Sequence, residues 1–313
     1  GIHVAVGCTE PNSLNILTVK QKERSTGRRA ETGASTSKLV SQPDYHKSYF
    51  YRVRWTPDDT EILSTAHDGI VNVYDVKAGV KSDKFDSDIN QHDLRVMPSC
   101  PRVVLVCAGN KVLTWDRRAA PEPVHTYLES TTTRFLDCEV SHDGNMLFMS
   151  SINGTVSIWD RRRPLSPLHL LVDPTDSKRK AIASLHLDDT GTRLLLSSET
   201  NRVILVDLLQ VAHAPHFRPT SSFPTPSTLL SNLPGQKVFT DSNYTSERYL
   251  RDAVFSPDFK TVVAVSDQPQ TFAWNIQSGQ VTARLAPSEE DALQQSAVQC
   301  AVSPHCNPPL VAV

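Results

Sequence analysis

The sequence predicts an all-β fold in which similar small sheets surround a central channel, a β-propeller. Three observations support this prediction: a unit of short strands recurs along the chain, its apolar residues alternate with period two, and its turns carry Asp-Gly or Asn-Gly. Most copies of the unit begin roughly 40–45 residues apart, which is the spacing typical of propeller blades. Each sheet has two faces to bury, and radial packing between two neighbours buries both.

Four copies of the unit are well formed and a fifth is degenerate. The well-formed copies are residues 50–76, 135–160, 181–207 and 250–275, and the degenerate one is 94–116. Half copies at 3–19 and 297–313 predict incomplete first and last blades. We therefore expect one propeller domain over residues 1–313, with seven blades, or six if the two end fragments share a blade.

The turns between the predicted strands carry residues that tolerate a positive φ. Asp143-Gly144, Asn153-Gly154 and Thr190-Gly191 each separate two apolar runs. Glycine adopts the left-handed backbone of a tight hairpin without a steric penalty. These positions are therefore predicted to be hairpin turns within blades.

Two stretches interrupt the repeat. Residues 20–45 are rich in Ser, Thr and basic side chains, and we expect a disordered basic insertion loop there. The basic residues within 20–38 are a weak indication of nucleic-acid contact, and no aromatic residues lie among them for base stacking. Residues 212–248 contain several prolines and no clear alternation, which predicts a long loop between blades.

The sequence shows no constellation typical of an enzyme. The GxSxG, GxGxxG, P-loop and HExxH motifs are all missing, and the His-Asp pairs at His67-Asp68 and His142-Asp143 fall in predicted turns. The six cysteines lack the spacing of a zinc site, which favours reduced thiols in a nuclear or cytosolic protein. The net charge of −2 and the lack of an apolar run near 18 residues argue against a nucleic-acid-coating or membrane protein. We expect a protein without catalysis, cofactor or metal.

Binding of a protein partner is the function that remains. A propeller presents rigid surfaces built from loops, and its channel mouth is lined where the inner strands begin. Aromatic, arginine and acidic residues at those positions are the candidate partner-binding residues: Tyr51, His92, Asp93, Arg95, Arg134, Asp137, Arg251 and Asp252.

The repeated unit resembles the WD-repeat family. The family dipeptide occurs as Trp115-Asp116 and Trp159-Asp160 and is altered to Tyr74-Asp75, Val206-Asp207 and Trp274-Asn275. In that family a buried hydrogen-bond network links a turn Asp, a loop His and the Trp of one blade. Because the Gly-His dipeptide is missing from every unit, we expect this network to be incomplete in most blades and apolar packing to dominate.

The order of regular and degenerate blades is similar to one particular group of WD-repeat proteins. Residues 73–109, 125–164, 191–210 and 255–265 resemble the small subunit shared by COMPASS-type histone methyltransferase and PNUTS–protein phosphatase 1 or transcription termination complexes. This resemblance implies an adaptor subunit in the nucleus, with the cytoplasm as the alternative location. It implies a monomer within a hetero-complex that binds a peptide segment of a large scaffold subunit and acts in transcription termination or chromatin regulation.

A second resemblance leads to a different function. Trp-Asp-x-Arg occurs in two consecutive blades, ending at Arg118 and Arg162. This pattern is similar to substrate receptors of cullin-4 ubiquitin ligases, in which the arginine contacts the ligase adaptor. The alternative to a methyltransferase or phosphatase subunit is therefore a substrate receptor that uses these two arginines.

Overall fold

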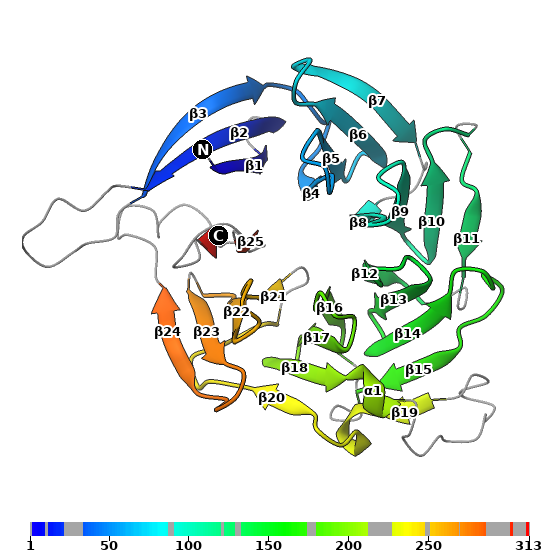
Figure 1. Ribbon diagram of the computed structural model, residues 1–313, viewed down its shortest axis with the longest axis vertical. Coiled ribbons are helices and arrows are strands. Elements are labelled where there is room, and N and C mark those ends of the chain that lie inside the picture. Colours follow the sequence, from blue (N-terminus) through cyan, green and yellow to red (C-terminus); the bar gives the residue numbers. More distant parts are fainter. Residues whose placement is uncertain are drawn as a thin grey trace, which may run out of the picture.

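A computed structural model gives the architecture for most of the chain. It describes residues 2–9, 12–21, 34–86, 91–119, 122–128, 133–173, 180–211, 227–247, 251–268, 270–285, 301–302 and 311–312. The described strands form seven sheets that follow one another in chain order around a ring (Figure 1). The predicted all-β propeller fold is confirmed, whereas the number of blades stays a prediction.

The first three sheets are antiparallel and consecutive. The first contains β1 (Ile2–Thr9), β2 (Asn12–Gln21) and β3 (Ala34–Gln42). The second contains β4 (Phe50–Trp55), β5 (Glu61–Ala66), β6 (Ile70–Asp75) and β7 (Val80–Asp86). The third contains β8 (Gln91–Val96), β9 (Val103–Ala108), β10 (Lys111–Asp116) and β11 (His125–Tyr127).

The next sheets repeat the same plan, with one added strand. The fourth contains β12 (Phe135–Val140), β13 (Met146–Ser151), β14 (Thr155–Asp160), β15 (His169–Val172) and β19 (Ser227–Leu229), which pairs in parallel with β15. The fifth contains β16 (Ile182–Leu187), β17 (Arg193–Ser198), β18 (Arg202–Asp207) and β20 (Lys237–Phe239). The helical turns α1 (Leu208–Val211) and η1 (Leu230–Asn232) lie between β18 and β20 in the chain.

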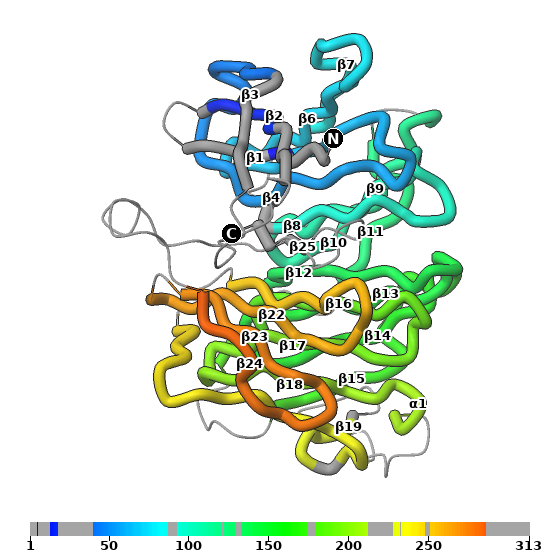
Figure 2. Tube along the Cα trace, turned by 60° about the vertical axis from the view of Figure 1, so that its left-hand side comes forward, coloured from blue at the N-terminus to red at the C-terminus, as the bar shows by residue number. Residues whose placement is uncertain are grey.

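The last two sheets approach the first. β21 (Ala253–Phe255), β22 (Thr261–Val265), β23 (Thr271–Asn275) and β24 (Val281–Leu285) form the sixth sheet. β25 (Ala301–Val302) and β26 (Val311–Ala312) form a two-stranded seventh. In the view of Figure 1, β25 lies between the β1–β3 sheet and the β21–β24 sheet. Figure 2 shows the β21–β24 sheet and the β4–β7 sheet from another side.

The hydrophobic cores lie between sheets. The aromatic residue of each family dipeptide packs towards the preceding sheet: Tyr74 of β6 joins Leu14 and Ile16 of β2, and Trp159 of β14 joins Val112 of β10. Apolar contact between neighbouring blades thus buries both faces of each, as the repeat requires. The predicted turns are confirmed, since Gly144 and Gly191 have φ of 71° and 68°.

The structure differs from the sequence prediction in the two interrupted stretches. Residues 34–42, assigned to the disordered loop over 20–45, form β3 and pair with β2, while residues 22–33 lie outside the described part of the chain. Within the predicted loop 212–248, β19 and β20 complete the outer edges of two sheets. Both strands are three residues long and β20 is mostly exposed, so neither gives an alternation that a sequence pattern could detect.

Candidate functional site

A β-bulge at the same place in four inner strands aims one side chain towards the centre of the ring. The pairing register shifts between Phe50 and Arg52 in β4, and equivalent shifts occur in β8, β12 and β16. The residues after the shift are Arg52, Asp93, Asp137 and Ser184. A bulge redirects a side chain relative to the regular pleat, and here it brings residues of separate blades to one point.

Arg52 is the centre of a buried ion-pair cluster. Its guanidinium lies 2.7 Å from Asp93, 2.7 Å from Asp252 and 3.6 Å from Asp137. Arg95 extends the cluster, at 3.3 Å from both Asp137 and Glu139. We call these six residues, which come from β4, β8, β12 and the segment just before β21, the central charge cluster.

Burial and charge in the cluster shift the pKa values of Asp93 and Asp137 in opposite directions. Burial alone would raise the pKa of Asp93, but Arg95 and Arg52 outweigh it and hold that pKa below its usual value. Burial raises the pKa of Asp137, and the neighbouring Asp93 carboxylate adds to the rise. Two carboxyl groups this close in a dry site favour the form in which one of them keeps its proton.

The cluster also ties neighbouring blades together. Asp137 accepts a hydrogen bond of 2.7 Å from the backbone N–H of Leu185, and Asp93 accepts one of 3.4 Å from Cys138. The side chain of Ser184 continues the pattern by accepting from the N–H of Ala253 at 3.2 Å. The inner strands β4, β8, β12 and β16 are thus each bonded to the inner strand that follows, which restrains this part of the ring.

Four of the predicted partner-binding residues belong to this cluster, and the structure places them differently from the expectation. Asp93, Arg95, Asp137 and Asp252 are buried inside the ring rather than exposed at its mouth. Each pairs with a charge from another strand, because an unpaired charge at this depth would be unfavourable. Arg251, also predicted, is buried and pairs with Asp267 at 2.6 Å.

Two of the remaining predicted residues, Tyr51 and Arg134, lie at the end of the ring where the inner strands begin. Tyr49, Tyr51 and His67 form an aromatic group, with ring centroids 5.6 Å apart for the two tyrosines and 5.0 Å for Tyr49 and His67. Arg134 is exposed just before β12, and its charge acts on Tyr51. We call Tyr49, Tyr51, His67 and Arg134 the mouth patch. The side chain of His92 lies outside the described residues.

The mouth patch combines apolar rings with a cation. Tyr49 is 46% exposed, so it offers a large aromatic surface to a partner. Burial raises the pKa of Tyr51 to about 12, and the contact with Tyr49 adds to the rise, so this hydroxyl stays protonated and can donate a hydrogen bond at neutral pH. Aromatic and arginine side chains are typical anchors of peptide-binding surfaces.

The two Trp-Asp-x-Arg motifs have the same geometry. Arg118 binds the Asp116 carboxylate through Nε at 2.9 Å and a terminal nitrogen at 2.7 Å, and Arg162 binds Asp160 at 2.9 Å through both. Both arginine side chains are more than half exposed, at 64% and 71%. They are thus available at the surface, with one face of each guanidinium occupied by the local carboxylate.

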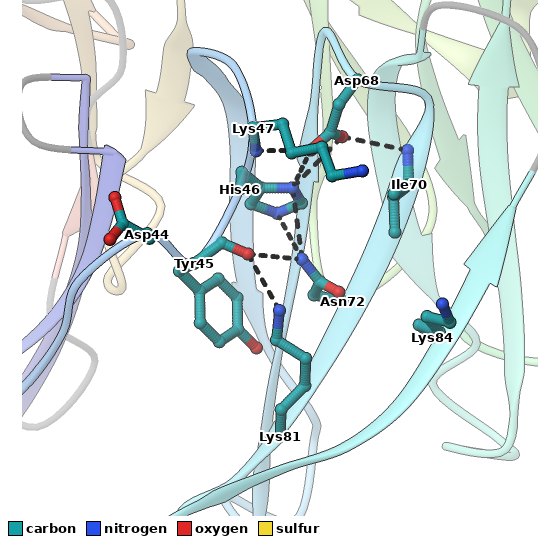
Figure 3. Close-up of a pocket in the computed structure, with 9 residues that line it drawn as sticks. All are labelled: Asp44, Tyr45, His46, Lys47, Asp68, Ile70, Asn72, Lys81 and Lys84. Carbon is teal, nitrogen blue, oxygen red and sulfur yellow. Dashed lines mark hydrogen bonds and ion pairs between the residues drawn. The ribbon is translucent and has the colours of Figure 1, made fainter.

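One blade holds a Ser-His-Asp arrangement that the sequence analysis missed. His46 lies 2.8 Å from the Ser64 hydroxyl. On the other side of its ring, His46 lies 3.0 Å from Asp68 (Figure 3). The arrangement resembles a hydrolytic triad, but the Ser64 side chain is fully buried and faces no open space for a substrate. It instead links the loop before β4 to β5 and to the β5–β6 turn. His46 thus supplies the histidine of the family network without a preceding glycine, but the Tyr74 hydroxyl, at the position of the family Trp, makes no hydrogen bond within the described part of the chain, so the network is incomplete in this blade, as expected.

Asp68 also acts in its own turn, as its predicted role required. Its carboxylate accepts from the backbone N–H of Ile70 at 3.1 Å and of Lys47 at 2.9 Å. Burial lowers the pKa of His46 despite the opposing effect of Asp68, which keeps the imidazole neutral at neutral pH. In the sequence, this network is indicated only by a histidine 22 residues before a turn aspartate. Without the glycine that precedes this histidine in the family, that indication is weak.

Comparisons with known proteins agree with the fold. Residues 37–75 and 121–160 match the WD domain, G-beta repeat. No curated protein matches the chain. Among the described residues there is no group of three or more His, Cys, Asp or Glu side chains that could hold a metal, and no helix there is long and apolar enough to cross a membrane.

The two matched segments are WD repeats, and together with the ring of sheets they support a WD-repeat β-propeller. Domains of this class mediate protein–protein interactions and are typically non-catalytic scaffolds. The two matched repeats therefore suggest a protein-interaction scaffold.

Proposed function

We propose that the protein is a non-catalytic adaptor that holds a peptide segment of a larger scaffold subunit on the mouth patch. The observation that carries this proposal is the aromatic group of exposed Tyr49 with half-buried Tyr51 and His67, beside exposed Arg134. Tyr51 is adjacent in β4 to Arg52, whose side chain is fixed by the central charge cluster, and a preorganised surface binds a flexible peptide at a lower entropic cost. The complex we propose is a nuclear methyltransferase or phosphatase assembly that acts in chromatin regulation or transcription termination, by the resemblance given above.

Purification of the tagged protein from cells, with identification of the proteins that co-elute, tests this proposal. The variant Tyr49→Ala/Arg134→Glu should lose the scaffold subunit, because it removes an aromatic anchor and reverses a charge on the mouth patch. Lys260→Glu reverses an exposed charge in the β21–β22 turn and is the matched control. Retention of the same partners by the mouth variant, at wild-type yield, would contradict the mouth patch as the docking surface.

The second candidate function is a receptor of a cullin-4 ubiquitin ligase. The matching exposed geometry of Arg118 and Arg162 on consecutive blades favours it. Arg118→Ala/Arg162→Ala should release a ligase adaptor if this function holds, and should leave a methyltransferase or phosphatase assembly intact if the first does. The proteins that co-elute with wild type and with this double variant therefore separate the two functions.

A further inference from the structure

A pocket lies where the loop before β4 crosses the outer strands of the β4–β7 blade (Figure 3). It has a volume of ≈ 200 Å³, which is roughly that of six water molecules. The residues that line it come from the loop, the β5–β6 turn, β6 and β7: Asp44, Tyr45, His46, Lys47, Asp68, Ile70, Asn72, Lys81 and Lys84. It is separate from the mouth patch, with which it shares no residue.

The wall of the pocket is fixed by the His46 network. Asp68 accepts hydrogen bonds from His46 and from two backbone N–H groups, so donors already surround its negative charge. Asn72 donates from its amide to the backbone carbonyl of Tyr45 at 2.9 Å. These contacts hold the wall in one arrangement, which is the condition for a selective site.

The three lysines supply more positive charge than the pocket neutralises. Lys81 donates to the Tyr45 carbonyl at 2.9 Å and lies 4.4 Å from the Tyr45 ring centroid, so a neutral group and an aromatic face hold it. Lys84 is directly opposite Asn72 in the β6–β7 register. Neither Lys47 nor Lys84 makes an ion pair with any residue that the structure describes.

The lysines also act on one another. Burial lowers the pKa of Lys81, and the positive charge of Lys84 adds to the lowering while Asp68 opposes it. By comparison, a cation on another outer strand has an acidic partner, since Arg284 of β24 pairs with Asp241 at 2.6 Å. The pocket therefore holds like charges close together without the internal partner that Arg284 has, and a bound anion would relieve their repulsion.

We propose that this pocket binds the carboxylate side chain of an acidic segment in a partner protein. Lys47 and Lys84 approach from two different elements and would each donate to the carboxylate, while Lys81 supplies a fixed third charge. Three lysines and two aspartates line the pocket, so the excess is one positive charge, which suits a monoanionic carboxylate better than a phosphate dianion. Lysine is a point donor that needs no bidentate geometry, which fits the side chain of either Asp or Glu. This site goes beyond the mouth patch and does not depend on it.

The chemical shift of the Ile70 methyl group is a direct probe, because Ile70 lines the pocket. In the full-length protein with ¹³C-labelled isoleucine methyl groups, an acetylated and amidated tetra-glutamate peptide should shift this signal saturably. The matching tetra-glutamine peptide should not shift it. Inorganic phosphate is the third probe, and a tighter effect of phosphate than of tetra-glutamate would overturn the assignment to a carboxylate.

Variants of the lysines give the second measurement. Lys47→Gln and Lys84→Gln should each weaken tetra-glutamate binding about two- to fivefold, the range for a single exposed ion pair. Lys77→Gln, an exposed lysine in the β6–β7 turn outside the pocket, should leave the affinity unchanged. Equal weakening by all three variants, or an Ile70 shift that tetra-glutamine reproduces, would overturn the proposal. The mouth variant should keep the Ile70 response, so failure of one proposal does not carry over to the other.

Discussion

Replacing Arg52 by methionine tests whether the central charge cluster holds the ring together. Methionine keeps most of the side-chain volume of arginine but removes the charge and all its hydrogen-bond donors. In the variant Asp93 and Asp252 each lose a partner at 2.7 Å, and Asp137 loses one at 3.6 Å. Three carboxyl groups would remain buried around an apolar side chain.

The expected loss can be estimated in two ways. Removing one partner of a buried ion pair costs about 3–5 kcal/mol. Alternatively, the protein can keep one carboxyl protonated at pH 7; from the reference pKa of 3.8 this costs about 4.4 kcal/mol, at about 1.36 kcal/mol for each pKa unit. Both estimates give a loss of about 4 kcal/mol in the free energy of unfolding. At about 2 °C for each kcal/mol in a chain of this size, Tm should fall by roughly 6–10 °C.

Thermal unfolding followed by circular dichroism, at pH 7.5 and at pH 5, is the measurement. Arg54→Met is the matched control on the same strand: burial and then Arg95 and Arg52 lower the pKa of Arg54, and its ion pair with Asp93 is 4.0 Å long. We expect Arg54→Met to change Tm by less than about 2 °C, as for a single weak ion pair.

The pH dependence of the Arg52→Met variant has a defined sign. Without Arg52, Asp93 loses one of the charges that hold its pKa down and Asp137 loses one that opposes the rise of its pKa, so the folded variant binds more protons through these two groups than folded wild type does. Their contribution to stability is present at low pH and is lost as pH rises. The Tm difference from wild type should therefore be smaller at pH 5 than at pH 7.5. A Tm within 2 °C of wild type at pH 7.5 would refute the reasoning, as would equal differences at the two pH values.

Two further predictions concern a histidine and a glycine. In the unfolded chain His46 becomes protonated below its usual pKa of 6.5, whereas the buried imidazole has a lowered pKa and stays neutral to lower pH. The contribution of His46 to the stability of the fold therefore decreases as pH drops from 7.5 to 5. Asp137, whose pKa is raised, has the opposite effect on stability. His46→Gln should thus lose less stability than wild type over this interval in urea unfolding, and parallel pH profiles would contradict the assignment. Gly144→Ala should lower Tm more than Gly191→Ala, because both have a positive φ but a Cβ at Gly144 would lie 2.7 Å from Ser99 Oγ and 2.8 Å from Met97 Sδ, while nothing lies within 4 Å at Gly191. Equal losses, of about 1–2 kcal/mol each from backbone strain alone, would show that the Ser99 and Met97 side chains move aside freely.

Part of the candidate site could be predicted from the sequence. Strand alternation placed Tyr51 and Arg134 at the starts of inner strands, and the structure puts both at the mouth of the ring. The same alternation placed Asp93 and Asp137 beside them but could not show that both are buried. Period two fixes which face of a strand a residue occupies, and burial of that face depends on what stands opposite.

The partner of those aspartates could not be predicted. Arg52 and Asp252 are 200 residues apart, and nothing in either segment indicates that the two lie 2.7 Å from each other. Lys47, Lys81 and Lys84 likewise look like ordinary solvated lysines in the sequence. They line one pocket only because the loop before β4 folds across the blade at its outer edge.

The sequence by itself determined the strands, the hairpin turns and the apolar faces, because these follow from interactions between residues close in the chain: period-two burial and the backbone preference of glycine. Only the tertiary structure decided which charges neutralise one another and which remain unpaired at the surface. Those outcomes depend on distances across the ring and on the depth of burial, which arise when distant blades meet and have no local signature.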